Sequence, residues 1–157
     1  MNIKEKIMAG HTWEDHVLVD DDELKDRLRF GKYDGSSYGG RTAIVSRFES
    51  EKIAYNAIKK GLAAKQGEIE KWLKEGCCKN LTLRIRFLQV IGHSFVKSTD
   101  WNTSYPATEM LVILEADVHY RDFIIKTAYP TPARIVQDKI RADQKAFRDA
   151  RAQRIPR

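Results

Sequence analysis

Four histidines are the side chains of this sequence best suited to proton transfer near neutral pH, because the pKa of a free imidazole is about 6.5. They are His11, His16, His93 and His119. The first two lie in the segment His-Thr-Trp-Glu-Asp-His, five positions apart. On a helix this spacing turns the two rings roughly 140° apart, whereas a helical zinc motif needs histidines at i and i+4. We therefore expect no metal site here, and a helical histidine by itself is more often structural than catalytic.

Three further residues carry groups that could act beside an imidazole. Arg27 follows His16 on the next predicted helix, and its guanidinium matches the geometry of a phosphate. Thr127 and Tyr129 stand two positions apart near the end of a predicted strand, so a hydroxyl and a phenol face the same side. Arg27 and Tyr129 also have ordinary interpretations: Arg27 as a surface arginine, and Tyr129 as a strand-end tyrosine that packs on the core.

Three segments of the chain, taken in order, resemble one known family. They are His11-Thr12, His16-Val17 and Asp22-Glu23-Leu24 with Arg27-Leu28; then Ser46-Arg47-Phe48 before a helix with Ile69, Trp72 and Leu73; then Lys126-Thr127-Ala128-Tyr129-Pro130. Together they resemble the bacterial ribonuclease A-like toxin domain of contact-dependent growth inhibition toxins, over about residues 10–130. The resemblance implies a ribonuclease A-like α+β fold. It departs at His93, where the family usually has arginine after the glycine, and it does not include the tail after Pro132.

The resemblance implies catalytic roles for His16, Arg27, Thr127 and Tyr129, and these roles fit RNA cleavage without a metal. In that reaction the neighbouring 2′-hydroxyl attacks the phosphate, so a base such as His16 must take its proton. Arg27 can hold the charge that develops on the phosphorane, and Thr127 can bond a phosphate oxygen. Tyr129 can donate a hydrogen bond or a proton to the departing 5′-oxygen. His11 is a candidate second acid/base or a structural residue.

The elements that must position these residues follow from hydrophobic spacing. Helices are predicted over part of 3–17, over 21–30 with Asp20 as N-cap, over 50–75 and beyond Pro132, and strands over 42–48, 81–87, 108–116 and 120–128. Glycines and other turn residues mark 31–41, and most of 92–106, as loop. Helices followed by a run of strands predict an α+β domain with an antiparallel sheet.

Composition limits the class of protein. The chain has 157 residues, enough for one domain with a core, and its apolar runs are too short to cross a bilayer. Cys77 and Cys78 are adjacent, so a disulfide between them is not expected and the fold should be stable without disulfides.

The net charge is +6, but residues 133–157 hold eight Lys or Arg and three Asp, which leaves a net charge of +1 for the rest of the chain. We predict a toxin domain over 1–132 and a basic helical extension over 133–157, which either contacts RNA or is solvated.

The sequence thus predicts an endoribonuclease that yields a 2′,3′-cyclic phosphate without a metal or cofactor. By the resemblance it is a monomeric toxin, delivered as part of a larger effector into the cytoplasm of a neighbouring bacterium and blocked by a cognate immunity protein. Residues 1–9 lack the apolar stretch of a signal peptide. The alternative is a non-catalytic RNA-binding or toxin-related module; a DNA nuclease is disfavoured because the sequence shows no cluster of metal-binding carboxylates.

The proposed reaction makes a geometric demand. One phosphate must be reached by the base, the cation and the leaving-group donor together, so their functional atoms must lie within several ångströms of one another. His16 and Arg27 must therefore meet Thr127 and Tyr129, although about 100 residues separate the two groups.

Overall fold

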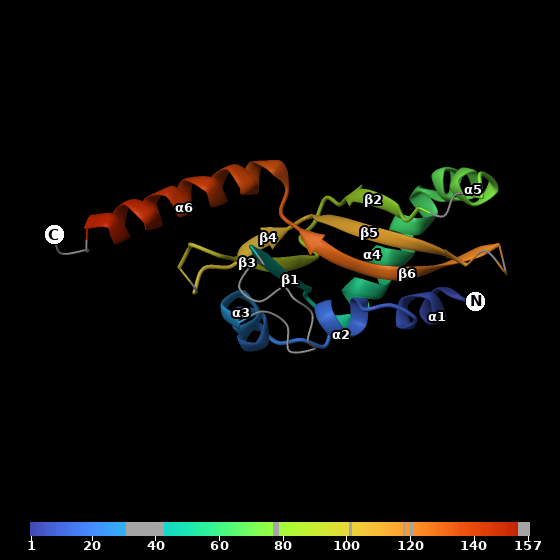
Figure 1. Cartoon of the computed structure of the whole chain (residues 1–157), viewed down its shortest axis with the longest axis horizontal. Helices are drawn as coiled ribbons and strands as arrows, with labels where there is room; N and C mark the ends of the chain where they lie inside the picture. The colour runs from blue at the N-terminus through green and yellow to red at the C-terminus, as the bar shows by residue number, and fades with distance from the viewer. Residues whose placement is uncertain (31–42, 77–78, 101, 118, 120, 154–157) are drawn as a thin grey trace.

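The computed structural model of the chain describes all residues except 31–42, 77–78, 101, 118, 120 and 154–157. The predicted 31–41 loop and the two cysteines therefore lie outside the described residues. The elements, in chain order, are α1 (Ile3–Met8), α2 (Thr12–His16), α3 (Asp21–Phe30), β1 (Ile44–Phe48), α4 (Glu51–Ala64), α5 (Gln66–Lys74), β2 (Leu81–Arg86), β3 (Gly92–Val96), β4 (Tyr105–Ala107), β5 (Glu109–Asp117), β6 (Asp122–Thr131) and α6 (Arg134–Gln153) (Figure 1).

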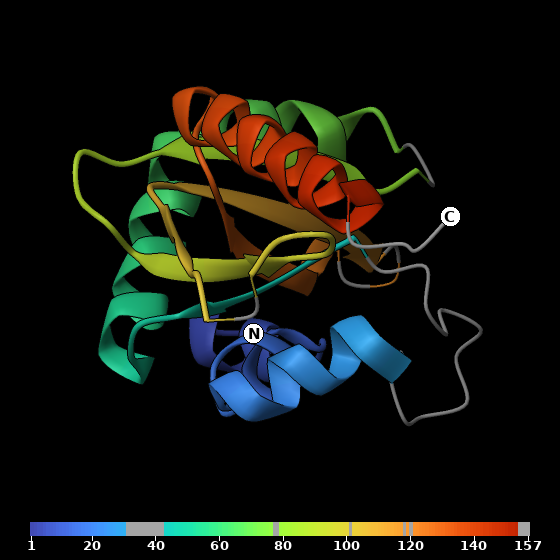
Figure 2. The same ribbon diagram turned by 90° about the vertical axis from the view of Figure 1, so that its left-hand side faces the viewer.

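The strands form two antiparallel sheets, one with the order β1-β3-β4 and one with the order β2-β5-β6. The predicted α+β class is therefore confirmed, with two small sheets in place of one. Figure 2 shows the N-terminal helices on one side of the strands and α6 on the opposite side. None of the described helices is long and apolar enough to span a membrane.

The main core lies between α4 and the β2-β5-β6 sheet. Helix α4 buries Ala54, Ile58 and Leu62 against residues of the sheet such as Leu83 and Met110. Because the buried positions of α4 recur every three or four residues and those of β2 every two, each element presents one apolar face to this layer. Burial of these side chains is the dominant stabilising term of the fold.

The predicted single helix over 50–75 is two helices that meet at Lys65. Ser50 caps the first helix as predicted, since its Oγ accepts from the Ile53 N–H at 3.1 Å. The break redirects the chain so that Ile69 and Trp72 of α5 reach the same core as α4. Gly76 follows α5 with φ of 61°, a conformation that glycine adopts without steric cost.

The segment 92–106, predicted to be mostly loop, contains β3 and the first two residues of β4, so the prediction missed these strands, whereas the described residues between them lie outside any strand. Strand β3 has no alternation that a sequence pattern could detect, because Ser94, Phe95 and Val96 are all buried. Strand β6 also runs past the predicted end at residue 128, and Pro130 pairs with Met110.

Two smaller apolar clusters hold α3 and α6 on the β1-β3-β4 sheet. Leu24 and Leu28 of α3 are buried as predicted, and they form a cluster with Val19, Val45 and Phe95. On the other face, Val136 and Ile140 of α6 pack against Val96 and Tyr105. Since Val45 pairs with Phe95 in register, both lie on the face that α3 covers.

Candidate active site

The N-terminus of α2 docks on the outer edge of β6. The His11 N–H donates to the Lys126 carbonyl at 2.9 Å, and the Ala128 N–H donates to Thr12 Oγ1 at 2.8 Å. Gly10 lies against the carbonyls of Ile125 and Lys126, where a Cβ atom would clash. These contacts satisfy polar groups at the edge strand of the sheet and fix α2 beside β6.

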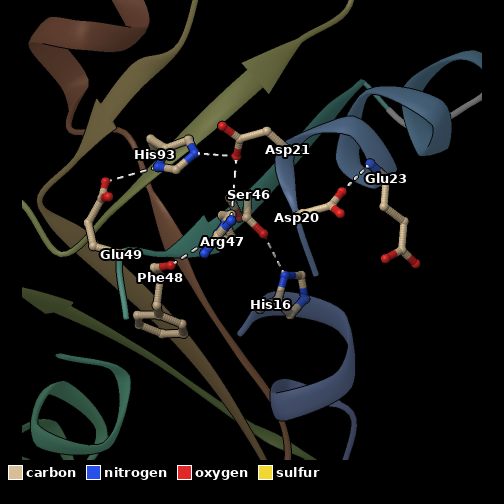
Figure 3. A network of polar contacts seen from close by, with 9 residues as sticks. All are labelled: His16, Asp20, Asp21, Glu23, Ser46, Arg47, Phe48, Glu49 and His93. Carbon is tan, nitrogen blue, oxygen red and sulfur yellow. Dashed lines mark hydrogen bonds and ion pairs between the residues drawn. The ribbon is translucent and has the colours of Figure 1, made fainter. Parts of the chain in front are cut away.

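His16, at the end of α2, is oriented by the edge of the other sheet. Its Nδ1 lies 2.9 Å from the Ser46 carbonyl oxygen of β1, as Figure 3 shows. A carbonyl oxygen only accepts, so Nδ1 carries the proton of this hydrogen bond. In the neutral ring the lone pair is then on Nε2, the atom able to accept a proton.

Tyr129 lies beside His16. The two ring centroids are 5.4 Å apart with an interplanar angle of 36°. The predicted proximity of these two residues is therefore confirmed. Thr127 precedes Tyr129 by two positions on β6, and strand alternation puts both on the same half-buried face.

Arg27 reaches the backbone next to His16. Its Nη1 donates to the Asp15 carbonyl at 2.8 Å, and its Nη2 lies 3.0 Å from Glu23 Oε1. Only 12% of this side chain is exposed. The helix that carries it begins with the predicted cap, since Asp20 Oδ1 accepts from the Glu23 N–H at 2.8 Å. The Arg27 guanidinium is thus held at the C-terminal end of α2, the helix that carries the His16 imidazole.

The other histidines have different surroundings. His11 is the exposed N-cap residue of α2, and its side chain makes no capping hydrogen bond. His119 is exposed in the connection between β5 and β6. His93 lies on β3 between two carboxylates, those of Asp21 and Glu49. Among the residues that the structure describes, no three His, Cys, Asp or Glu side chains come together to hold a metal ion.

Sequence reasoning named the candidate catalytic side chains but not the residues that contact and orient them in the structure. Gly10 and Thr12 act through close backbone approach and a buried hydroxyl, and Ser46 acts through a carbonyl that any residue would supply. Thr12 offered one signal, since a threonine at the start of a helix has a hydroxyl available for local hydrogen bonding. Nothing in the side chain of Ser46 indicates its contact with His16.

Comparison with known proteins gives two matches. Residues 10–130 match the family model described as the bacterial CdiA-CT RNAse A domain. The solved structures include a similar chain in the crystal structure of a CdiA-CT/CdiI complex from Y. kristensenii 33638. The TM-score is 0.64 at 25% identity, and the alignment covers 78% of this chain and 100% of that one. The search of curated proteins found no match. The family match spans His16, Arg27, Thr127 and Tyr129.

Proposed function

Because the chain belongs to the family of bacterial CdiA-CT RNase A domains, we propose that it is a toxin that cleaves RNA by attack of the 2′-hydroxyl on the adjacent phosphate. The products are a 2′,3′-cyclic phosphate and a 5′-hydroxyl. The observation that carries this proposal is the pairing of His16, whose Nδ1–H is held by the Ser46 carbonyl, with the ring of Tyr129. It provides a proton acceptor and a proton donor side by side.

His16 is the general base of the proposed reaction. With Nδ1 donating to the Ser46 carbonyl, Nε2 takes the proton from the 2′-hydroxyl. The hydrogen bond fixes both the tautomer and the ring orientation, so the base does not have to be ordered when RNA binds.

Arg27 stabilises the negative charge that develops on the phosphorane. The guanidinium has five N–H donors, and the contacts with the Asp15 carbonyl and Glu23 orient it without using all five. A cation held in place before the reaction is worth more than one that must reorganise. Thr127 donates its hydroxyl hydrogen to a phosphate oxygen on the same face.

Tyr129 supports the departing 5′-oxygen as a hydrogen-bond or proton donor. Its position beside His16 allows both to act on one phosphate. His11 remains the second candidate for this proton, while its backbone N–H holds β6 whichever group donates. Imidazole, guanidinium and phenol together cover every proton and charge of the reaction, so we propose that it needs no metal.

The proposed partners follow from the family and from the solved neighbour. That neighbour is a complex of a CdiA-CT domain with CdiI. We propose that this chain likewise binds a cognate immunity protein and that, as part of a larger effector, it reaches the cytoplasm of a neighbouring bacterium. There it acts as a monomer on RNA.

The test is incubation of the purified protein with total RNA in EDTA, followed by analysis of the product ends. We expect fragments with 2′,3′-cyclic phosphate and 5′-hydroxyl ends. The His16→Ala protein is the matched control, because it excludes a contaminating nuclease and should lose cleavage by about 10²-fold or more. Activity that disappears in EDTA and returns with magnesium or zinc would reject the mechanism. RNA binding with no cleavage at all would favour the non-catalytic module.

A further inference from the structure

A polar cluster centred on His93 lies on the face of the β1-β3-β4 sheet that α3 covers (Figure 3). His93 Nε2 is 2.7 Å from Asp21 Oδ1, and His93 Nδ1 is 2.9 Å from Glu49 Oε1. Carboxylates only accept hydrogen bonds, so the ring satisfies both of them only when both nitrogens carry protons. The geometry is that of an imidazolium between two carboxylates.

The remaining neighbours of His93 are a cation, an aromatic ring and uncharged side chains. Arg47 pairs with His93 in register, and its Nη1 lies 3.8 Å from the same Asp21 oxygen. The rings of His93 and Phe95 are perpendicular to each other, with centroids 5.7 Å apart. Strand β4 and the segment before it contribute Pro106 and Ser104, which carry no charge, to an adjoining pocket of about 320 Å³. Among the described residues, the charged groups facing His93 are those of Asp21 on α3, Arg47 on β1 and Glu49 before α4, and Lys25 of α3 lies over the neighbouring Phe95 ring, 4.9 Å from its centroid.

This cluster holds the helix that carries Arg27. Asp21 is the first residue of α3, and Arg27 lies on the same helix. Among the described side chains of α3, the buried apolar ones are Leu24 and Leu28, which belong to a cluster separate from the main core. The polar contacts of Asp21 with His93 on β3 and Arg47 on β1 add to this apolar packing and join the start of the helix to the sheet.

We infer that His93 is a positioning residue for the proposed RNA cleavage: as an imidazolium it ties the start of α3 to the turn before α4 and so fixes Arg27 next to His16. The catalytic consequence rests on the proposed function, whereas the tie itself does not. Burial disfavours protonation of the ring, but the hydrogen bonds and charges of Asp21 and Glu49 outweigh it, so the pKa of His93 is raised above 6.5. At any given pH a larger share of His93 is therefore imidazolium than for a free histidine.

The first test needs no RNA and compares unfolding of the wild type with His93→Gln and His93→Arg from pH 5.5 to 8.5. A histidine with a raised pKa stabilises the fold fully below its unfolded pKa and loses this contribution as pH rises through the folded pKa. The advantage of the wild type over His93→Gln should therefore be largest at acidic pH and shrink toward pH 8.5. The permanently charged His93→Arg should show no such loss. His119→Gln, at an exposed histidine, is the matched control. Parallel wild-type and His93→Gln profiles would overturn the inference.

The second test is a double-mutant cycle between His93→Gln and Arg27→Ala, read in unfolding stability and in RNA cleavage. If His93 acts by placing Arg27, His93→Gln should lower kcat by roughly tenfold with little change in KM, and His93→Arg should restore it. In the Arg27→Ala background the same change should have almost no further effect. Equal losses in both backgrounds would refute the positioning role. If the wild type cleaves no RNA, the proposed function fails, and the stability coupling of the two residues still decides the inference.

Discussion

Tyr129 combines two features that one substitution separates: a ring that packs beside His16 and a hydroxyl that, in the proposed reaction, donates to the leaving group. Tyr129→Phe keeps the ring contact of 5.4 Å between centroids and removes only the hydroxyl. We expect the melting temperature to change little, while kcat for RNA cleavage falls by about 10²-fold, the usual scale of an acid–base contribution. Single-turnover cleavage of an RNA oligonucleotide measures this. A folded variant that cleaves at the wild-type rate would show that another group, with His11 the first candidate, serves the leaving oxygen.

The residue types of the site could be predicted from the sequence, whereas their supports could not. Imidazole, guanidinium and phenol have side-chain chemistry that suits a phosphate, and strand alternation places Thr127 and Tyr129 together. The Ser46 carbonyl that orients His16 is a backbone group, and its role depends on which strand edge happens to face α2. Such a contact exists only once two distant segments are packed.

At the scale of elements, one buried hydroxyl is among the contacts that dock α2 on β6. Thr12 Oγ1 accepts from the Ala128 N–H at 2.8 Å, and Thr12 is fully buried. Thr12→Val keeps the shape but leaves this N–H unsatisfied, which should cost about 1–3 kcal/mol of unfolding free energy. It should also lower cleavage, because His16 is carried by the same helix. Denaturant unfolding measures the first effect, and Thr12→Ser, which keeps the hydroxyl, should recover most of both. Equal stability of Thr12→Val and wild type would contradict this account.

Helix α6 has two halves with different surroundings. Its first half packs on the sheet through Val136 and Ile140, and Asp143 accepts a hydrogen bond from the Tyr105 hydroxyl at 2.8 Å. Its second half extends beyond the strands in Figure 1. We still propose that residues 133–157 tune RNA affinity and not chemistry. A truncation after Pro132 would expose Tyr105, so charge substitutions in the second half are the cleaner test.

Replacing Lys145, Arg148 and Arg151 with Gln removes three exposed charges of α6. If all three contact phosphates of single-stranded RNA, the slope of log binding constant against log salt should flatten by about 2. Turnover at saturating RNA should stay near the wild-type value. Titration of a 2′-O-methyl oligonucleotide at several salt concentrations gives the slope. An unchanged slope would assign α6 a purely structural or solvent-facing role.

The elements that sequence reasoning missed share a physical cause. At Lys65 one predicted helix is divided into two, and both halves bury side chains in the same core, Ile69 and Trp72 among them. Strand β3 is buried on both faces, so the alternation that identifies β2 is absent from it. At Lys65 and in β3 the local structure depends on contacts with distant segments, which a pattern of neighbouring residues does not reveal.

At the scale of the whole molecule, the candidate site forms where the two sheets meet. Strand β1 is the edge of one sheet and β6 the edge of the other. His16 bridges them, since its ring bonds the Ser46 carbonyl of β1 and lies beside Tyr129 of β6. The proposed reaction requires the segments that carry His16 and Tyr129 to lie close together, and this was predicted from the sequence. The division of the strands into two sheets was not evident from the sequence. The requirements of the proposed reaction therefore predicted that His16 and Tyr129 lie together, whereas the arrangement of the strands in two sheets was not predicted.

A second long-range tie joins α1 to the start of β6. Asp122 Oδ1 lies 2.7 Å from Lys6 Nζ and accepts from the Phe123 N–H at 2.8 Å. The same ammonium lies over the ring of Phe123, 3.7 Å from its centroid. Burial disfavours the carboxylate, but the hydrogen bonds and charge of Lys6 and the Phe123 N–H outweigh it and hold the pKa of Asp122 below 3.8. The charged carboxylate therefore stabilises the fold.

A lowered carboxyl pKa stabilises the protein above its unfolded pKa, and the contribution is lost as pH falls through the lowered folded value. The difference in unfolding free energy between wild type and Asp122→Asn should therefore be constant from pH 7 to about 5. It should then shrink as the pH falls below 3.8, the ordinary pKa of an aspartate. Asn keeps an acceptor for the Phe123 N–H, so the comparison isolates the charge. Asp138→Asn, at an exposed i,i+3 pair with Arg141, is the matched control and should show little effect at any pH. An Asp122→Asn difference that persists unchanged at pH 2.5 would show that the side chain stabilises the fold by shape and not by charge.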